Sequence, residues 1–263
     1  ATGEESLFRV AMRAADLLVE RFMDEAPLYT DGHEEIEIAL VRLSRHTGKP
    51  VYRELARRLV DRRGKIRLFG LHFLTQFLRI TGRMNTVSAL RRHYYRDHGG
   101  VVRASLPEHN RHKIPAFTPL RFVVSALSGK YTQQHAPLRR QVSPEGHAVR
   151  FAYLNTAATM IARDEQDDSL GQHLEKLWSA MASRRMYVTG GIGSLPLIEG
   201  FGRDYELDPE TAYAETCAAL GCMQWNHEMS RFTGNPKYED LFEWQLYNAA
   251  SVGMEQEGTR YFY

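Results

Sequence analysis

The sequence has few cysteines, no long apolar run and no excess of charge of one sign. Cys217 and Cys222 are the only cysteines among 263 residues, which excludes a disulfide scaffold and favours a reducing, cytoplasmic compartment. No apolar run approaches the ~18 residues of a membrane helix, so no membrane partner is expected. With 34 basic and 32 acidic residues, net charge indicates no partner. The 43% of hydrophobic residues are typical of a globular protein.

The charge is unevenly distributed along the chain. Residues 65–130 contain twelve Lys and Arg but only two acidic residues, Asp97 and Glu108. Such an asymmetry is typical of a nucleic-acid-binding insert, of an exposed insertion, or of poor-quality coding sequence. Because the basic residues form no clean helical stripe and no nucleic-acid motif is present, we expect no nucleic-acid partner. We interpret 65–130 as an anomalous basic insertion.

Outside that stretch the sequence predicts an all-α fold. Apolar residues recur at the three- and four-residue spacing of a buried helix face. This pattern predicts helices at 7–22, 36–43, 52–59, 148–163, 170–184, 212–233 and 238–251.

A weak internal repeat indicates how the helices are connected. The segment 47–55, TGKPVYREL, resembles 233–241, TGNPKYEDL. Glycine ends the first helix of each pair in the left-handed conformation, and proline begins the second helix. Thr2-Gly3 and Thr81-Gly82 are candidate degenerate copies. Repeated αα-hairpins close into a solenoid or a toroid, although an ordinary helical bundle would show the same pattern.

One long segment is not helical. The sequence YVTGGIGS begins at Tyr187, and irregular chain continues to Pro209. Connections of this length inside a domain tend to be functional. The glycine cluster lacks the Lys-Ser/Thr ending of a phosphate loop, so we do not favour that interpretation. The segment carries Glu199 on a Gly-flanked loop among apolar neighbours, a position suited to a general acid. The alternative is a solvated loop glutamate.

Further candidate residues follow this loop or begin helices. On a regular helix, Glu215 and Cys217 would point in nearly opposite directions and could not bind the same metal ion. An extended or first-turn backbone would bring both side chains to one zinc ion. The alternative is a small core cysteine. Glu243 lies among aromatic residues, where a carboxylate needs either a hydrogen-bonding or ion-pairing partner or a functional role. The alternative is a partly exposed helix residue paired with a nearby Arg or Lys. His33 and His147 each follow a glycine at a helix start, where a histidine is either satisfied by backbone or binds a sugar hydroxyl.

These motifs resemble the glycoside hydrolase family 127 β-L-arabinofuranosidases. The resemblance rests on the segments 32–37 with 39–43, 146–150, 186–194, 212–219, 225–227, 246–248 and 258–263. The motifs are long, occur in order, and cover nearly everything except the basic stretch.

The resemblance implies part of an (α/α)6 barrel, followed in the family by β-sandwich domains. It implies retaining hydrolysis of plant-type β-L-arabinofuranosides by a cysteine nucleophile that a zinc ion holds. By the same resemblance, Glu215 and Cys217 are two of four zinc ligands and Glu199 is the general acid/base. Glu243 is a further active-site glutamate, and the sugar pocket is lined by His33, His147 and Tyr263.

The sequence departs from the family pattern in two respects. The family connects 61–64 to 134–139 through a shorter segment, where residues 65–130 intervene here. The family's nucleophile and its neighbouring cysteine ligand lie beyond the position of Tyr263, so we expect 1–263 to be a fragment of the catalytic domain without the β-sandwich region. The chain alone would then be inactive. An open barrel would also expose apolar surface, which predicts association, including a homo-oligomer. The alternative function is a noncatalytic sugar-binding or assembly protein.

Overall fold

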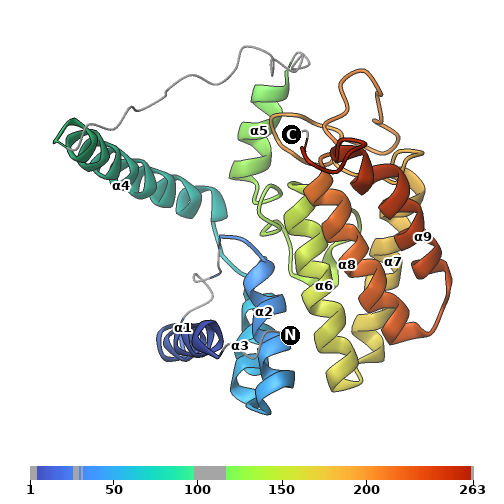
Figure 1. Ribbon diagram of the computed structural model, residues 1–263, viewed down its shortest axis with the longest axis horizontal. Coiled ribbons are helices and arrows are strands. Elements are labelled where there is room, and N and C mark those ends of the chain that lie inside the picture. Colours follow the sequence, from blue (N-terminus) through green and yellow to red (C-terminus); the bar gives the residue numbers. More distant parts are fainter. Residues whose placement is uncertain (1–4, 26–29, 31, 98–116, 262–263) are drawn as a thin grey trace.

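The computed structural model describes residues 5–25, 30, 32–97 and 117–261. In these residues helices alternate with loops, and β-structure is limited to isolated bridges (Figure 1). The prediction of an all-α fold is therefore confirmed. The α-helices are α1 (Ser6–Phe22), α2 (Glu35–Thr47), α3 (Pro50–Arg62), α4 (Phe69–Asp97), α5 (Thr118–Leu127), α6 (Ala148–Glu165), α7 (Asp168–Arg184), α8 (Thr216–Thr233) and α9 (Lys237–Gln245). Short 3-10 turns lie at Leu138–Arg140 and Ser251–Gly253.

The two predicted repeats are αα-hairpins with the same turn. Gly48 ends α2 at φ 72°, and Gly234 ends α8 at φ 70°, both left-handed. The threonine before each glycine donates its hydroxyl to a carbonyl one turn earlier and accepts the amide two residues later. Pro50 is the first residue of α3, as expected of a residue that has no amide to donate. The repeat thus encodes the connections α2–α3 and α8–α9.

Some predicted boundaries are wrong. The helix expected from residue 212 begins at Thr216, because Ala214 has φ 37° and Glu215 is extended, so neither residue is helical. The helix expected to reach residue 251 ends at Gln245 and continues as a π-helix, Leu246–Ala250. Thr81-Gly82 is not a hairpin turn, since it lies inside α4. Thr2-Gly3 lies outside the described residues.

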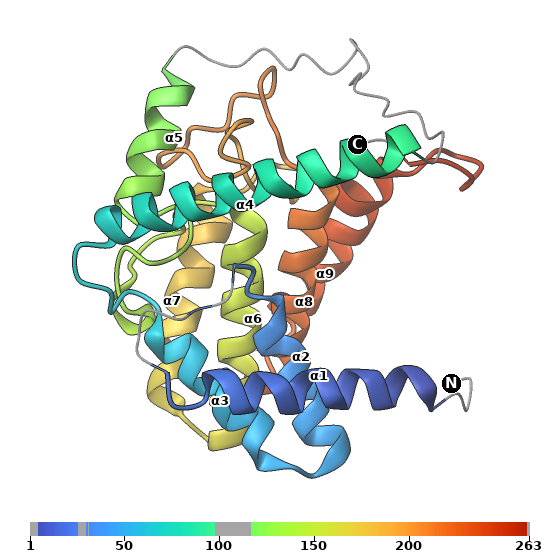
Figure 2. The ribbon, with the colours of Figure 1, turned by 90° about the vertical axis from the view of Figure 1, so that its left-hand side faces the viewer.

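Helix α6 is the centre of the core. It packs against α2, α3, α7 and α8, and Figure 2 shows it between α7 and α8. The ring of Phe151 meets those of Trp225 on α8 and Phe201 on the irregular loop edge to face, at 5.5 Å and 5.2 Å. All three side chains are buried. The aromatic cluster therefore fixes the irregular loop to the same helix that His147 directly precedes.

A buried chain of hydrogen bonds joins α7, α8, α9 and the irregular loop. Trp178 Nε1 donates to Asn226 Oδ1 at 2.6 Å, and Asn226 Nδ2 donates to Gln245 Oε1 at 2.8 Å. Gln245 Nε2 in turn donates to the carbonyl of Gly190 at 2.7 Å. Asn226 and Gln245 are fully buried, so each polar group has a partner that offsets its desolvation.

Helices α4 and α5 belong to the predicted basic insertion. Helix α4 projects from the body in Figure 1 and packs against α5. Large apolar side chains are exposed on both, among them Leu71, Leu78, Leu120 and Val124. That exposure supports the expectation of association, which stays a prediction. Among the described helices, none combines the length and the apolar character of a membrane span.

Candidate active site

The irregular loop is pinned against the start of α6. His147 and Gly200 form an antiparallel bridge. The amide of Ala148 donates to the carbonyl of Glu199 at 3.0 Å, and that of Phe201 donates to the carbonyl of Gly146 at 2.9 Å. A Cβ on Gly200 would lie 1.9 Å from the Gly146 oxygen, so only glycine allows this approach. The bridge places the side chains of His147 and Glu199 next to each other.

Both oxygens of the Glu199 carboxylate are engaged. His147 Nε2 lies 3.0 Å from Glu199 Oε2, and Tyr213 Oη donates to Glu199 Oε1 at 3.1 Å. The histidine side chain is 9% exposed, whereas that of Glu199 is 40% exposed. The carboxylate thus meets solvent while a buried imidazole and a phenol fix its direction. Glu199 also has φ 50°, a left-handed backbone that the surrounding loop must hold in place.

His147 is electrically neutral near pH 7. Burial lowers its pKa to about 4, with Arg150 acting in the same direction and Glu199 opposing it. A neutral imidazole whose Nε2 faces a carboxylate carries its proton on Nε2, so we assign Nε2–H as the donor to Glu199. The contact is therefore a hydrogen bond from a neutral donor to Glu199.

Glu215 and Cys217 meet at the start of α8. Glu215 is the residue before the helix and has an extended backbone, with φ −66° and ψ 152°. Cys217 is the second helical residue, and its thiol donates a hydrogen bond to the Glu215 carboxylate. This is the first-turn geometry that lets residues two apart converge. Glu215, His147 and Glu199 each offer one potential metal-ligating atom, and these atoms lie within 4.8 Å of one another.

The donor set fits a zinc ion in part. Carboxylate and thiolate are both zinc ligands, and Glu215 and Cys217 offer one of each to the same point. Without a cation, burial and the Glu215 carboxylate raise the pKa of the Cys217 thiol to about 12. Cys222 adds no ligand, because it is fully buried with Sγ 3.6 Å from Met181 Sδ. Within the described residues, one carboxylate and one thiol thus meet at the start of α8.

The other three predicted site residues are His33, Glu243 and Tyr263. His33 is exposed, lies 5.4 Å from the Tyr153 ring, and is near enough to lower the pKa of His147. Glu243 is exposed on α9, with neither a side-chain hydrogen bond nor an ion pair in the described part of the chain. Tyr263 lies outside the described residues. The roles predicted for these three residues stay predictions.

Sequence reasoning missed three side chains around Glu199. Tyr213, which bonds Glu199 directly, lies inside a motif used for the resemblance, but nothing in its spacing indicated a contact with a residue fourteen positions earlier. Tyr131 contacts the His147 ring at 5.7 Å, and the Arg150 guanidinium lies 5.2 Å from the Tyr131 ring. The sequence could have indicated that Arg150 lies near His147, because it follows His147 by one helical turn.

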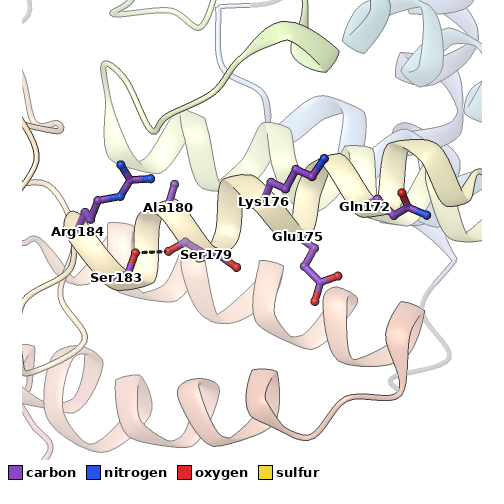
Figure 3. A pocket seen from close by; sticks show the side chains of 7 residues that line it. All are labelled: Gln172, Glu175, Lys176, Ser179, Ala180, Ser183 and Arg184. Atoms are coloured by element: carbon purple, nitrogen blue, oxygen red, sulfur yellow. Dashed lines mark hydrogen bonds between the residues drawn. The ribbon is translucent and has the colours of Figure 1, made fainter.

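A second hollow, on the outer face of α7, is not the candidate site. Figure 3 shows its side chains, which all belong to this one helix. Ser183 donates to the backbone of Ser179, and Glu175 is ion-paired with Lys237 at 2.8 Å. Ser183, Glu175 and, through Asp204, Arg184 are thus engaged with their neighbours, and no pair of titratable groups there resembles a catalytic arrangement.

The fold and sequence match known enzymes over the whole chain. A solved β-L-arabinofuranosidase of glycoside hydrolase family 127 from Geobacillus stearothermophilus T6 superposes with a TM-score of 0.76 at 30% identity, covering 100% of this chain and 35% of that one. A second solved β-arabinofuranosidase of this family gives 0.73 at 27% identity, covering 100% and 32%. The non-reducing end β-L-arabinofuranosidase of Bifidobacterium longum subsp. longum is 30% identical over 100% of this chain and 34% of its own length.

These matches define first a class and then a family. The helical hairpins are part of an (α/α)6-type glycosidase domain, as the resemblance implied. The chain belongs to the glycoside hydrolase family 127 β-L-arabinofuranosidase catalytic domain, whose family model matches residues 1–263. It spans about a third of the length of the relatives that it matches.

Proposed function

We propose that this chain forms the part of a β-L-arabinofuranosidase that holds the general acid/base and grips the terminal sugar of a plant-type arabinofuranoside. The supporting observation is the carboxylate of Glu199, held through both oxygens by His147 and Tyr213. A carboxyl group fixed in direction but open to solvent suits proton exchange with a substrate oxygen.

Glu199 acts twice in the proposed retaining reaction. In the first step it gives its proton to the departing glycosidic oxygen, and in the second step it takes a proton from the incoming water. The neutral Nε2–H of His147 and the hydroxyl of Tyr213 bond the carboxylate that remains after the first transfer. They therefore stabilise the charged state that the second step needs.

Glu215 and Cys217 would hold zinc, together with two further ligands from outside this sequence. Bound zinc supplies a positive charge that keeps thiols ionised near neutral pH. The resemblance implies a cysteine nucleophile, and neither Cys217, which is assigned as a ligand, nor Cys222, which lies in the core, would take that role. His33, His147 and Tyr263 would line the sugar pocket, and Glu243 would be a further active-site residue.

Hydrolysis of p-nitrophenyl β-L-arabinofuranoside by the full-length polypeptide tests this function. Glu199→Gln keeps the shape of the side chain but cannot transfer a proton, so turnover should fall by about 10²–10⁴-fold while sugar binding persists. Glu210→Gln, an exposed carboxylate on the same irregular loop, is the matched control and should retain activity. Unchanged turnover in Glu199→Gln would remove the assignment of the general acid/base.

A further inference from the structure

A cleft of about 480 Å³ separates the first turns of α4 from the body of the molecule. Phe69 and Phe73 of α4 line one side, with ring centroids 6.2 Å apart. Thr132 and Arg150 line the opposite side. One wall of the cleft thus comes from the predicted basic insertion, and the other comes from residues that follow it in the sequence.

The cleft begins next to the candidate active site. Arg150 follows His147 by one turn of α6, so the two side chains lie on the same face. The Tyr131 ring touches both of them, at 5.2 Å and 5.7 Å. Gly32, the residue before His33, also lines the cleft. A molecule whose terminal sugar contacts His147 and Glu199 would therefore have this cleft one helical turn away, beyond the Tyr131 ring.

Two side chains that line this cleft each have a polar atom buried without a hydrogen-bond partner, Arg150 Nε and Thr132 Oγ1. Arg150 has no carboxylate partner within the described ranges, and neither does Arg79 on the α4 side of the cleft. Arg63 differs, since the buried carboxylates of Glu34 and Glu37 lie 2.9 Å and 3.2 Å from its guanidinium. Buried donors without partners are costly and rare, which favours a ligand that satisfies them.

We propose that this cleft binds a carboxylate-bearing sugar, of the uronic acid class, in the part of the substrate beyond the scissile bond. The guanidinium of Arg150 matches a carboxylate in charge and geometry, and Thr132 offers a hydroxyl to the same ring. Phe69 and Phe73 supply the apolar wall that a sugar ring needs. The position beyond the scissile bond rests on the proposed function, whereas the binding of a uronate does not.

Calorimetric titration of the 263-residue chain at low salt tests the inference directly. The probes are methyl α-D-galacturonoside and the neutral methyl α-D-galactoside, which differ only in the carboxylate. We expect the uronoside to bind at least about tenfold more tightly, the effect of one charge-assisted hydrogen bond. Acetate, which has the carboxylate without the ring, should bind more weakly than the uronoside.

Variants assign the binding to the cleft. Arg150→Gln should remove the tenfold preference. Arg79→Gln, at an exposed position where folding is not at risk, should weaken uronoside binding roughly threefold, as expected of an exposed charge pair. Arg140→Gln removes an exposed charge elsewhere and should change nothing. Circular dichroism of each variant verifies that it folds.

Two results would overturn the inference. One is equal affinity for the uronoside and the galactoside in the unmodified chain. The other is a uronoside preference that persists in folded Arg79→Gln and Arg150→Gln. Uronoside binding with the expected variant pattern, in a chain that does not bind L-arabinofuranosides, would support the cleft while contradicting the proposed function.

Discussion

His147 Nε2 lies 3.0 Å from Glu199 Oε2, although 52 residues separate them. The contact joins the first turn of α6 to the tip of the irregular loop. Since α6 is the most buried helix and His147 precedes its first residue, the imidazole is a fixed reference point. The loop carboxylate takes its direction from that point and from Tyr213.

Removing the imidazole should weaken catalysis more than stability. In the full-length polypeptide, His147→Ala should lower kcat by about 100-fold, because Glu199 loses its neutral donor and its orientation. His147→Gln, which can still donate a hydrogen bond, should recover part of the loss. His227→Ala, at an exposed histidine beside Glu239, is the control and should keep its rate. A His147→Ala enzyme with normal kcat would show that the contact has no catalytic role.

The close approach of the loop to α6 predicts a severe effect of Gly200→Ala. The new Cβ would meet the Gly146 carbonyl carbon at 2.6 Å and its oxygen at 1.9 Å, so the backbone must move. We expect a loss of about 2 kcal/mol or more in the free energy of unfolding. Gly82→Ala inside α4, where a Cβ meets nothing within 4 Å, should be neutral or stabilising by up to about 1 kcal/mol. Urea denaturation compares the two, and equal stabilities would refute the close approach.

Breaking the buried chain of amides should destabilise α7, α8 and α9 together. Asn226→Leu leaves Trp178 Nε1 and Gln245 Oε1 without partners in a fully buried region. Two unpaired buried groups predict a loss of about 2–5 kcal/mol in the free energy of unfolding. Thermal unfolding measures this, with His227→Gln as the exposed control on the same helix. A change in melting temperature no larger than that of the control would contradict the network.

The lowered pKa of Glu206 predicts how the free energy of unfolding depends on pH. Hydrogen bonds from Arg121, at 2.5 Å and 2.8 Å, are the main cause that lowers the pKa of this carboxyl from 4.5 to about 2. A carboxyl whose pKa is lower in the folded state stabilises the fold above pH 4.5, and this contribution disappears as the pH falls towards 2.

Glu206→Gln should therefore cost about 1–2 kcal/mol at pH 7, a value reduced by the partial exposure of the pair. The difference from the unmodified chain should shrink between pH 4.5 and pH 2. Urea denaturation at a series of pH values measures both quantities. A difference that is independent of pH would exclude the ion pair between α5 and the irregular loop as its source.

Much of the helical framework was predictable because its signals are local. The Thr-Gly-x-Pro segments specify their own turns through a left-handed glycine and a helix-starting proline. The start of α8 was misplaced because residues 212–215 are not helical: Ala214 has φ 37°, and its amide donates to the distant carbonyl of Gly193 at 2.7 Å. The π-helical end after Gln245 likewise has no signal in apolar spacing.

The site was predictable only in part, since its contacts join distant segments. Glu215 and Cys217 were expected to converge only on an extended or first-turn backbone, and in the structure Glu215 is extended while Cys217 lies in the first turn of α8. The contacts of Glu199 did not follow, because they depend on the approach of Gly200 to Gly146 in three dimensions. The family resemblance indicated which residues are candidates for the site, whereas their arrangement is determined by the packing of the loop against α6.

The most direct test of the central claim is an NMR titration of histidine-labelled chain with methyl β-L-arabinofuranoside. If the sugar binds beside Glu199, the imidazole signals of His147 should shift with the ligand, and those of His173 on α7 should not. His147→Ala assigns the signal. Saturable binding that leaves the His147 signal unmoved, or no binding at all, would contradict the proposed site.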